Sequence, residues 1–267
     1  MGDEPGSRDE ENRASRDRGG RPGVGLDHWR AEFPETQWTV LVQGNSEAGE
    51  FSTRAFIEMS GRYWYPLYVY ARRQGLSPED AQDATQGFFE DLVDGDRLRN
   101  VRPEKGRLRA YLLGAMKHHL AGIRRHDGAL KRGGGQVILS IDEELAEQRY
   151  QNEPSHAISP ETLFDRGWAL AVLQQAVDRL EAEFVARGKQ EQFQLVLPQL
   201  TGEGERGDHR EVAESLGISE SNVRVMVMRA RRRFREVLRE LIMETVHRPE
   251  DLDDELGHLM AALAEPT

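Results

Sequence analysis

One stretch, from residue 208 to 239, limits what this chain can fold into more than any other part of the sequence. Small and apolar residues recur there at three- and four-residue steps on either side of Gly217, a residue that suits a turn with a positive φ. Ser219 then stands where a second helix needs a capping residue. The sequence therefore predicts a helix-turn-helix whose second helix is basic. The positions expected to pack its two helices together are Val212, Ala213, Leu216, Val223, Met226, Val227 and Ala230.

The side of the second helix that this packing leaves free carries polar and basic residues. Near its N-terminal end, which such motifs insert into the major groove, stand Ser219, Ser221, Asn222, Arg224 and Met228. An arginine run follows, and it suits phosphates because a phosphate contact needs charge but little geometry. The run consists of Arg229, Arg231, Arg232, Arg233 and Arg235. The alternative is a helical hairpin with an arginine-rich solvated face.

The overall charge and composition exclude several classes of protein. The 267 residues carry a net charge of −11 with a pI near 5.3, which argues against non-specific coating of DNA. The absence of cysteine excludes a disulfide framework and a cysteine metal site. No apolar run approaches membrane-spanning length and no signal peptide is recognisable, so we expect a cytoplasmic protein that does not bind membranes. We expect neither a metal nor another cofactor.

A second informative stretch runs from residue 77 to 94. Ser77 followed by a proline and an acid predicts the start of a helix. That helix is expected to bury Ala84, Phe88 and Leu92 and to expose an acidic surface formed by Asp80, Asp83, Gln86 and Asp91. Such a surface suits a basic protein partner better than DNA, although an ordinary solvated face has the same spacing. The preceding aromatic stretch, 51–73, is expected to pack the core, with a kink at Pro66.

Basic charge concentrates between residues 97 and 132. Helical angles separate an apolar arc from a face on which small residues alternate with basic ones. Such a face lets a polyanion approach the backbone closely, so we favour nucleic-acid binding over a solvated face. Of the two adjacent histidines, His119 falls in the apolar arc and is interpreted as a packed, hydrogen-bonded residue. The basic face contains Arg107, Lys117, His118, Arg124 and Arg125.

The order of these segments predicts an all-α protein with two helical modules joined by a flexible acidic linker, the second module containing the helix-turn-helix. The glycine run at 131–136 lacks the ending of a phosphate-binding loop and is interpreted as linker. After residue 239 the charge becomes acidic, and leucines at helical spacing predict an amphipathic helix that docks on the body. The expected parts are a disordered tail (1–30), a first helical module (31–132), a linker (133–160), a helix-turn-helix module (161–240) and an acidic extension (241–267).

With the sequence DAQDATQGFF at 80–89 and the helix-turn-helix together, the chain resembles a bacterial RNA polymerase sigma factor of the extracytoplasmic-function (ECF) class. The resemblance covers about 51–132 and 165–240, and the C-terminal extension is similar to that of a longer subgroup. It implies that the first module binds core RNA polymerase and melts the promoter at the minus-ten element. The second module would read the minus-thirty-five element. The partners implied are core RNA polymerase, promoter DNA and an anti-sigma factor, unless the C-terminal tail provides control within the chain.

The resemblance also implies roles for individual residues. The residues that match the motif for binding the polymerase clamp are Asp80, Asp83, Gln86 and Phe89. The residues expected to meet the opened minus-ten strand are Arg107, Lys117, His118, Arg124 and Arg125. Those expected at the minus-thirty-five element are Ser219, Ser221, Asn222, Arg224, Met228, Arg229, Arg231 and Arg232. The chain departs from many members at His118, Gly122, Val225 and Met226, so its base preference does not follow from the family.

Two other classes of function compete with this interpretation. A stand-alone helix-turn-helix regulator would bind duplex DNA without polymerase, but it would leave the motif at 80–89 unexplained. A metal-dependent nuclease could use Asp251, Asp253 and Asp254, but no histidine or lysine stands with them, so we do not expect an enzyme. We also hypothesise that the acidic tail docks on one of the basic surfaces and weakens promoter use by the free protein.

Overall fold

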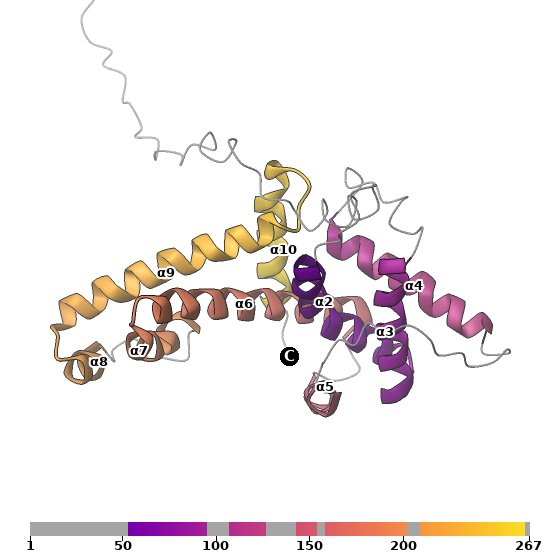
Figure 1. The fold of residues 1–267 in the computed structure, drawn as a ribbon, viewed down its shortest axis with the longest axis horizontal. Helices are drawn as coiled ribbons and strands as arrows, with labels where there is room; N and C mark the ends of the chain where they lie inside the picture. The colour runs from indigo at the N-terminus through magenta and orange to yellow at the C-terminus, as the bar shows by residue number, and fades with distance from the viewer. Residues whose placement is uncertain (1–52, 95–106, 127–142, 154–157, 202–208, 265–267) are drawn as a thin grey trace, which may run out of the picture. The chain divides into compact units, whose positions relative to one another are not determined.

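The structure is a computed structural model that describes residues 53–94, 107–126, 143–153, 158–201 and 209–264. Its elements in chain order are α2 (Thr53–Arg73), α3 (Pro78–Asp94), α4 (Leu108–His126), α5 (Glu143–Gln151), α6 (Pro160–Ala186), α7 (Gln190–Thr201), α8 (His209–Leu216), α9 (Glu220–Met243), the 3-10 turn η4 (Pro249–Asp251) and α10 (Leu252–Ala264). All described secondary structure is helical, which confirms the all-α prediction (Figure 1). The expected disordered tail at 1–30 and the glycine run at 131–136 lie outside the described residues.

Helix α2 is the centre of the larger hydrophobic core. Its aromatic residues Phe56, Tyr63 and Tyr70 are buried, as the sequence predicts, and α3, α4 and α6 pack around it. Burial of the Tyr63 hydroxyl raises its pKa above the ordinary value, because the phenolate would lose its hydration. The helix continues through Pro66, where the sequence predicts a kink.

Helices α2 and α6 approach each other closely at Gly167. A Cβ atom on Gly167 would lie 3.4 Å from the Cα of Pro66 and 3.5 Å from its Cγ. Because glycine has no side chain, α6 can lie directly against the proline ring of α2. This contact fixes where the 27-residue α6 crosses the first group of helices.

The buried residues form two clusters. The larger one includes residues from α2, α3, α4, α5, α10, the first part of α6 and the last part of α9. The smaller one joins α7, α8 and the first part of α9, with Phe184 at the end of α6 packed against it. Figure 1 shows α6 and α9 running side by side between these regions. The two helical modules expected from the sequence therefore share buried contacts along α6 and α9.

Helix α5 lies within the stretch that was expected to be a flexible linker. Glu147 of α5 accepts hydrogen bonds from Arg72 at 2.9 and 3.1 Å and from the hydroxyl of Tyr68. Burial alone would raise the pKa of Glu147, but the hydrogen bonds from Arg72 and Tyr68 hold it below its usual value. Tyr65 donates to Glu153 at 2.8 Å. Glu147 and Glu153 are therefore partners of α2, which a count of local charge could not show.

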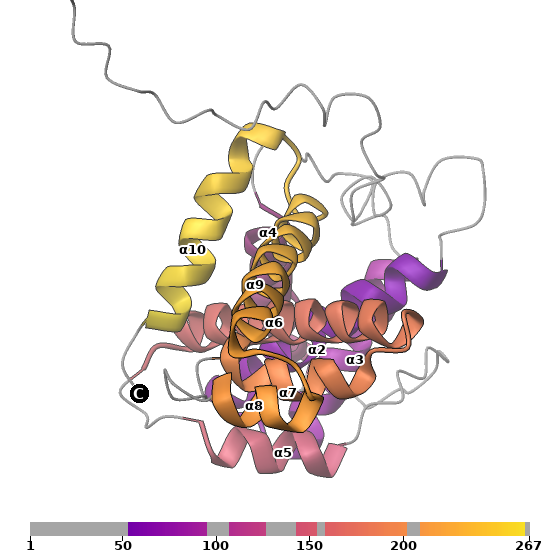
Figure 2. The same ribbon diagram turned by 90° about the vertical axis from the view of Figure 1, so that its left-hand side faces the viewer.

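Helix α10 is the docked amphipathic helix that the leucine spacing predicts. It packs on α6 and α9, and Figures 1 and 2 show it crossing α6. Leu252 and Leu259 are buried in the larger core, and Leu256 and Leu263 pack against it. The helix also buries the carboxylate of Glu255, which is 1 % exposed.

The close approach at Gly167 leads to a prediction about stability. Gly167→Leu should lower the free energy of unfolding by about 1–3 kcal/mol, because the new side chain must push α6 away from Pro66. The measurement is a urea titration followed by circular dichroism. Gly61→Leu is the control, since Gly61 is an exposed residue of α2 with no atom within 4 Å of an added Cβ. It should raise stability by up to about 1 kcal/mol through helix propensity, and equal effects of the two changes would contradict the packing described.

Candidate nucleic-acid and polymerase interfaces

The turn between α8 and α9 has the geometry that the sequence predicts. Gly217 has a φ of 63°, and the amide of Ile218 donates to the carbonyl oxygen of Ala213 at 3.0 Å. Ser219 then caps α9, since its hydroxyl accepts from the amide of Asn222 at 3.3 Å. The left-handed residue ends one helix and the serine starts the next, which fixes the angle of the motif.

The interior of the motif is closed by apolar side chains. Val212 and Ala213 of α8 are buried against Val223 and Val227 of α9, and Val196 of α7 completes the cluster. Leu216 and Met226 are partly buried at its edge. The packing of these positions is consistent with the predicted helix-turn-helix, and the opposite side of α9 faces solvent.

The residues predicted to meet the minus-thirty-five element are all exposed: Ser219, Ser221, Asn222, Arg224, Met228, Arg229, Arg231 and Arg232. Within α9, Arg224 lies 3.9 Å from Glu220 and Arg232 lies 3.0 Å from Glu236. Such exposed pairs at a four-residue spacing contribute about 0.3–0.5 kcal/mol each. A DNA phosphate can displace them at little cost, so these side chains remain available to DNA.

Two arginines of the run have partners inside the protein. Arg231 donates to the carbonyl oxygen of Gln199 at 2.8 and 3.2 Å. Arg233 donates to Glu183 of α6 at 2.6 Å and to Glu240 at 2.8 Å, and the hydrogen bond that it donates to Glu183 raises the pKa of Arg233. The expectation that Arg233 meets phosphate is wrong for this structure, because its side chain turns inward and ties α9 to α6.

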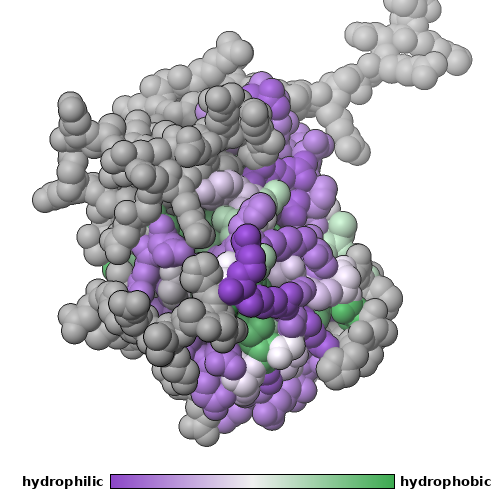
Figure 3. All heavy atoms as spheres, turned by 90° about the vertical axis from the view of Figure 1, so that its right-hand side faces the viewer, coloured by the Kyte–Doolittle hydropathy of each residue, from purple (hydrophilic) through white to green (hydrophobic). Residues whose placement is uncertain are grey.

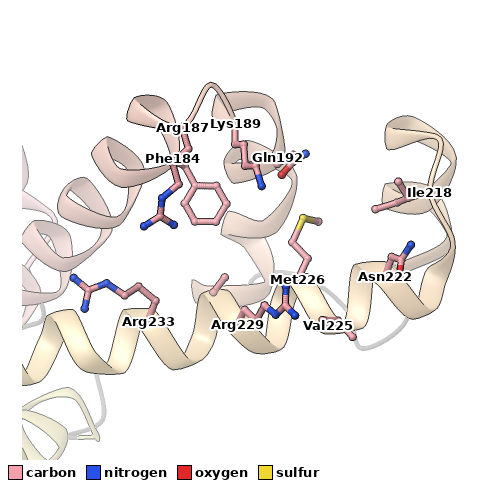
Figure 4. Close-up of a pocket in the computed structure, with 11 residues that line it drawn as sticks. Phe184, Arg187, Lys189, Gln192, Ile218, Asn222, Val225, Met226, Arg229 and Arg233 are labelled. Atoms are coloured by element: carbon pink, nitrogen blue, oxygen red, sulfur yellow. The ribbon is translucent and has the colours of Figure 1, made fainter.

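A groove of about 570 Å³ lies beside the turn between α8 and α9. It is formed by the end of α6, the start of α7 and α9 (Figure 4). Phe184 and Met226 contribute apolar surface, and Arg187, Lys189 and Arg229 contribute charge. The sequence does not indicate this groove, because the residues that line it come from segments far apart in the chain and share no local spacing.

The basic face of α4 is exposed at Lys117, His118, Arg124 and Arg125. Lys117 lies 2.8 Å from Glu161 at the start of α6, and the hydrogen bond to Glu161 raises the pKa of the lysine. Arg124 donates to the carbonyl oxygen of Gln74 at 2.9 Å. Seen from the side where α3 and α4 lie in Figure 1, the described surface is largely hydrophilic (Figure 3).

Arg107 differs from the other predicted minus-ten residues. Its Nε lies 2.9 Å from Glu255 and its Nη2 lies 3.6 Å from Asp254. Its Nη1 is also 2.8 Å from Nδ1 of His258. The structure thus corrects the expectation that Arg107 is open to DNA, because the first turns of α10 surround its guanidinium group.

His119, the neighbour of His118 in α4, is part of the packing. Nδ1 of His119 lies 3.0 Å from Asp91, and its ring stands edge-on to Phe88 at 6.0 Å between centroids. This confirms the interpretation of His119 as a packed, hydrogen-bonded residue. Among the residues that the structure describes, no group of three or more histidines and acids could hold a metal ion.

The acidic surface lies on α3, whose N-terminus is capped by Ser77. The hydroxyl of Ser77 accepts from the amide of Asp80 at 3.1 Å, as the capping signature predicts. Asp80 and Asp83 are exposed, and Gln86 is half-buried and donates to Glu90 at 3.1 Å. Phe89 is 0 % exposed, so its predicted contact with polymerase is not open in this structure.

The burial of Phe89 has a clear physical reason. Helix α3 packs against both α2 and α4, so two adjacent aromatic residues of α3 can both face the core. Phe89 meets Phe56 edge-on at 6.0 Å between ring centroids, and Phe88 lies beside it at 5.5 Å. Phe89 therefore packs in the core and supports the helix that carries the acidic surface.

Replacing the neighbouring residues Arg232 and Arg233 of α9 should have different effects on the free energy of unfolding. Arg233→Ala should lower the free energy of unfolding by about 1–2 kcal/mol, because it removes partly exposed, charged hydrogen bonds to Glu183 and Glu240. Arg232→Ala removes only the exposed pair with Glu236 and should change stability by about 0.5 kcal/mol or less. Chemical denaturation of both variants tests this. If Arg232→Ala lowers the free energy of unfolding more than Arg233→Ala does, Arg233 does not tie α9 to α6.

None of the helices in the described ranges is long and apolar enough to cross a membrane. Neither the search of curated proteins nor the search of solved structures gave a match. The family model described as ECF sigma factor matches residues 83–240, which is more than half of the chain and includes α4, α6 and the helix-turn-helix. The match does not favour the alternative of a stand-alone regulator. The chain belongs to the ECF sigma factor family, whose members bind core RNA polymerase and direct it to promoters.

Proposed function

We propose that this sigma factor uses three surfaces for its work. The acidic surface of α3, formed by Asp80, Asp83 and Gln86, binds core RNA polymerase. The basic face of α4 meets the opened minus-ten strand, and the exposed side of α9 reads the minus-thirty-five element. The first two surfaces belong to a module at 31–132 and the third to a module at 161–240. The protein acts in the cytoplasm and contributes no catalytic chemistry or cofactor of its own.

The observation that carries the proposal is the exposed first turns of α9 on a closed helix-turn-helix. A helix of this kind fits the major groove, where its N-terminal side chains reach base edges. Arg224 stands at that end with only a loose partner, Glu220 at 3.9 Å. Arg229 and Arg232 follow at positions suited to the phosphate backbone. This division of roles is what a minus-thirty-five reader requires.

The proposal for α4 is supported by a surface on which a small residue lies among basic ones. Ala121, between the basic residues, is exposed, so a single strand can come close to the helix. His118 is exposed beside Lys117 and offers a ring on which a base can stack. The pair between Lys117 and Glu161 is nearly half exposed on both sides and contributes at most about 1 kcal/mol. A phosphate can therefore replace Glu161.

The proposal for α3 is supported by a rigid and negatively charged surface. Asp80 and Asp83 belong to a helix that is capped by Ser77 and backed by the buried Phe88 and Phe89. A partner that carries positive charge would meet these acids without having to order them first. Such preorganisation favours binding because less conformational entropy is lost.

The first test is binding to core polymerase. Asp83→Asn combined with Gln86→Ala should weaken co-elution with core RNA polymerase by about tenfold or more, because the charge of the exposed Asp83 and the amide of the half-buried Gln86 are lost from the contact. Asp178→Asn is the control, since it removes a charge from an exposed position of α6. If the unaltered protein does not co-elute with core and does not let it start transcription from genomic promoter fragments, the proposed function is wrong.

The second test separates base reading from phosphate contact in the assembled holoenzyme. Arg224→Ala should relax the preference at one base pair of the minus-thirty-five element by about 1–3 kcal/mol. Arg232→Ala should weaken binding to all sequences alike and reduce the salt slope by about one. The measurement is promoter binding at several salt concentrations with a set of single-base variants. Identical profiles for the two changes would count against the assignment of roles.

A further inference from the structure

The C-terminal helix occupies a position that the proposed function gives to DNA. Arg107, at the start of α4, has its guanidinium group between Asp254, Glu255 and His258 of α10. Two of these three partners are carboxylates. A carboxylate and a phosphate present similar acceptor oxygens to an arginine, so both cannot hold Arg107 at once. This juxtaposition goes beyond the family match, which ends at residue 240.

The contact is not a loose surface pair. Glu255 is 1 % exposed and lies 2.8 Å from Nε of Arg109 as well as 2.9 Å from Arg107. Arg109 in turn lies 2.6 Å from Asp165 of α6, and its guanidinium stands 5.2 Å from the ring centroid of Trp168. Burial alone would lower the pKa of Arg109, but Glu255 and Asp165 raise it above its ordinary value. Salt screens a buried pair of this kind only weakly.

A second acid from the C-terminal part of the chain faces the same helix. Glu161, at the start of α6, lies 2.8 Å from Lys117 on the basic face of α4. Asp253 of α10 lies 3.3 Å from Arg239 and so ties α10 to α9 as well. Acids of α6 and α10 therefore pair with two residues of the predicted minus-ten surface, Lys117 and Arg107.

We propose that the structure is a closed form in which α10 masks the start of the minus-ten surface. This inference rests on the proposed role of α4. DNA alone competes poorly for Arg107, because Glu255 is buried and α10 must leave before the guanidinium is free. Binding of core polymerase displaces α10, and the released Arg107 then meets the phosphates of the opened strand. The helix thus keeps the free protein from engaging single-stranded DNA.

The first experiment follows α10 directly. The chain has no cysteine, so Ile57→Cys on α2 and Met260→Cys on α10 provide the only two attachment sites for spin labels. Both positions are exposed, at 57 % and 62 %. Electron paramagnetic resonance should give one narrow distance distribution for the free protein and a longer or broader one for the purified holoenzyme. An unchanged distribution in that holoenzyme would overturn the inference, whereas failure to form a holoenzyme would instead refute the proposed function.

The second experiment measures masking by charge. Asp254→Asn with Glu255→Gln should tighten binding of the free protein to a fluorescent, random-sequence single-stranded DNA of about 20 nucleotides by about fivefold or more. Asp253→Asn with Glu250→Gln removes the same charge from the same segment but leaves the partners of Arg107 in place. Equal tightening by the two double variants would contradict masking. If the first variant does not fold, the spin-label distances on otherwise unaltered side chains decide.

Discussion

The arrangement of segments that are far apart in the sequence depends on the ion pairs formed by the buried carboxylate of Glu255. A charge taken out of water is costly unless it is paired closely, and here Arg107 and Arg109 provide the pairing at 2.9 and 2.8 Å. Because Arg109 also contacts Asp165, the same cluster joins the start of α4, the first half of α6 and the C-terminal helix. Moving the start of α4 away would leave the carboxylate of Glu255 unpaired in the interior.

Helix α6 extends the consequences of that cluster along the chain. Its first half lies on α2, where Gly167 permits contact with Pro66, and its end packs against the helix-turn-helix through Phe184. A buried arginine, Arg62, adds a further connection, since it donates to Gln175 at 2.8 Å and lies 3.2 Å from Glu244. The first group of helices and the helix-turn-helix are thus linked through side chains along α6 and α9.

The sequence predicted what depends on local spacing. The turn at Gly217, the cap at Ser77 and the packed position of His119 each follow from neighbours within a few residues. Long-range pairing was not predictable in this way. The inward turn of Arg233 depends on Glu183, and the closed position of Arg107 depends on α10, far along the chain. Local charge patterns show that an arginine seeks an acid, but they do not show which one.

Glu255 and Arg109 hold α10 to the first group of helices through a coupled interaction. A double-mutant cycle with Arg109→Met and Glu255→Gln, followed by urea unfolding, measures that coupling without the separate effects of each change. We expect a coupling free energy of about 2 kcal/mol, because each residue alone leaves its partner poorly paired in the interior. A coupling free energy below about 0.5 kcal/mol would show that the pair between Arg109 and Glu255 does not hold α10 in place.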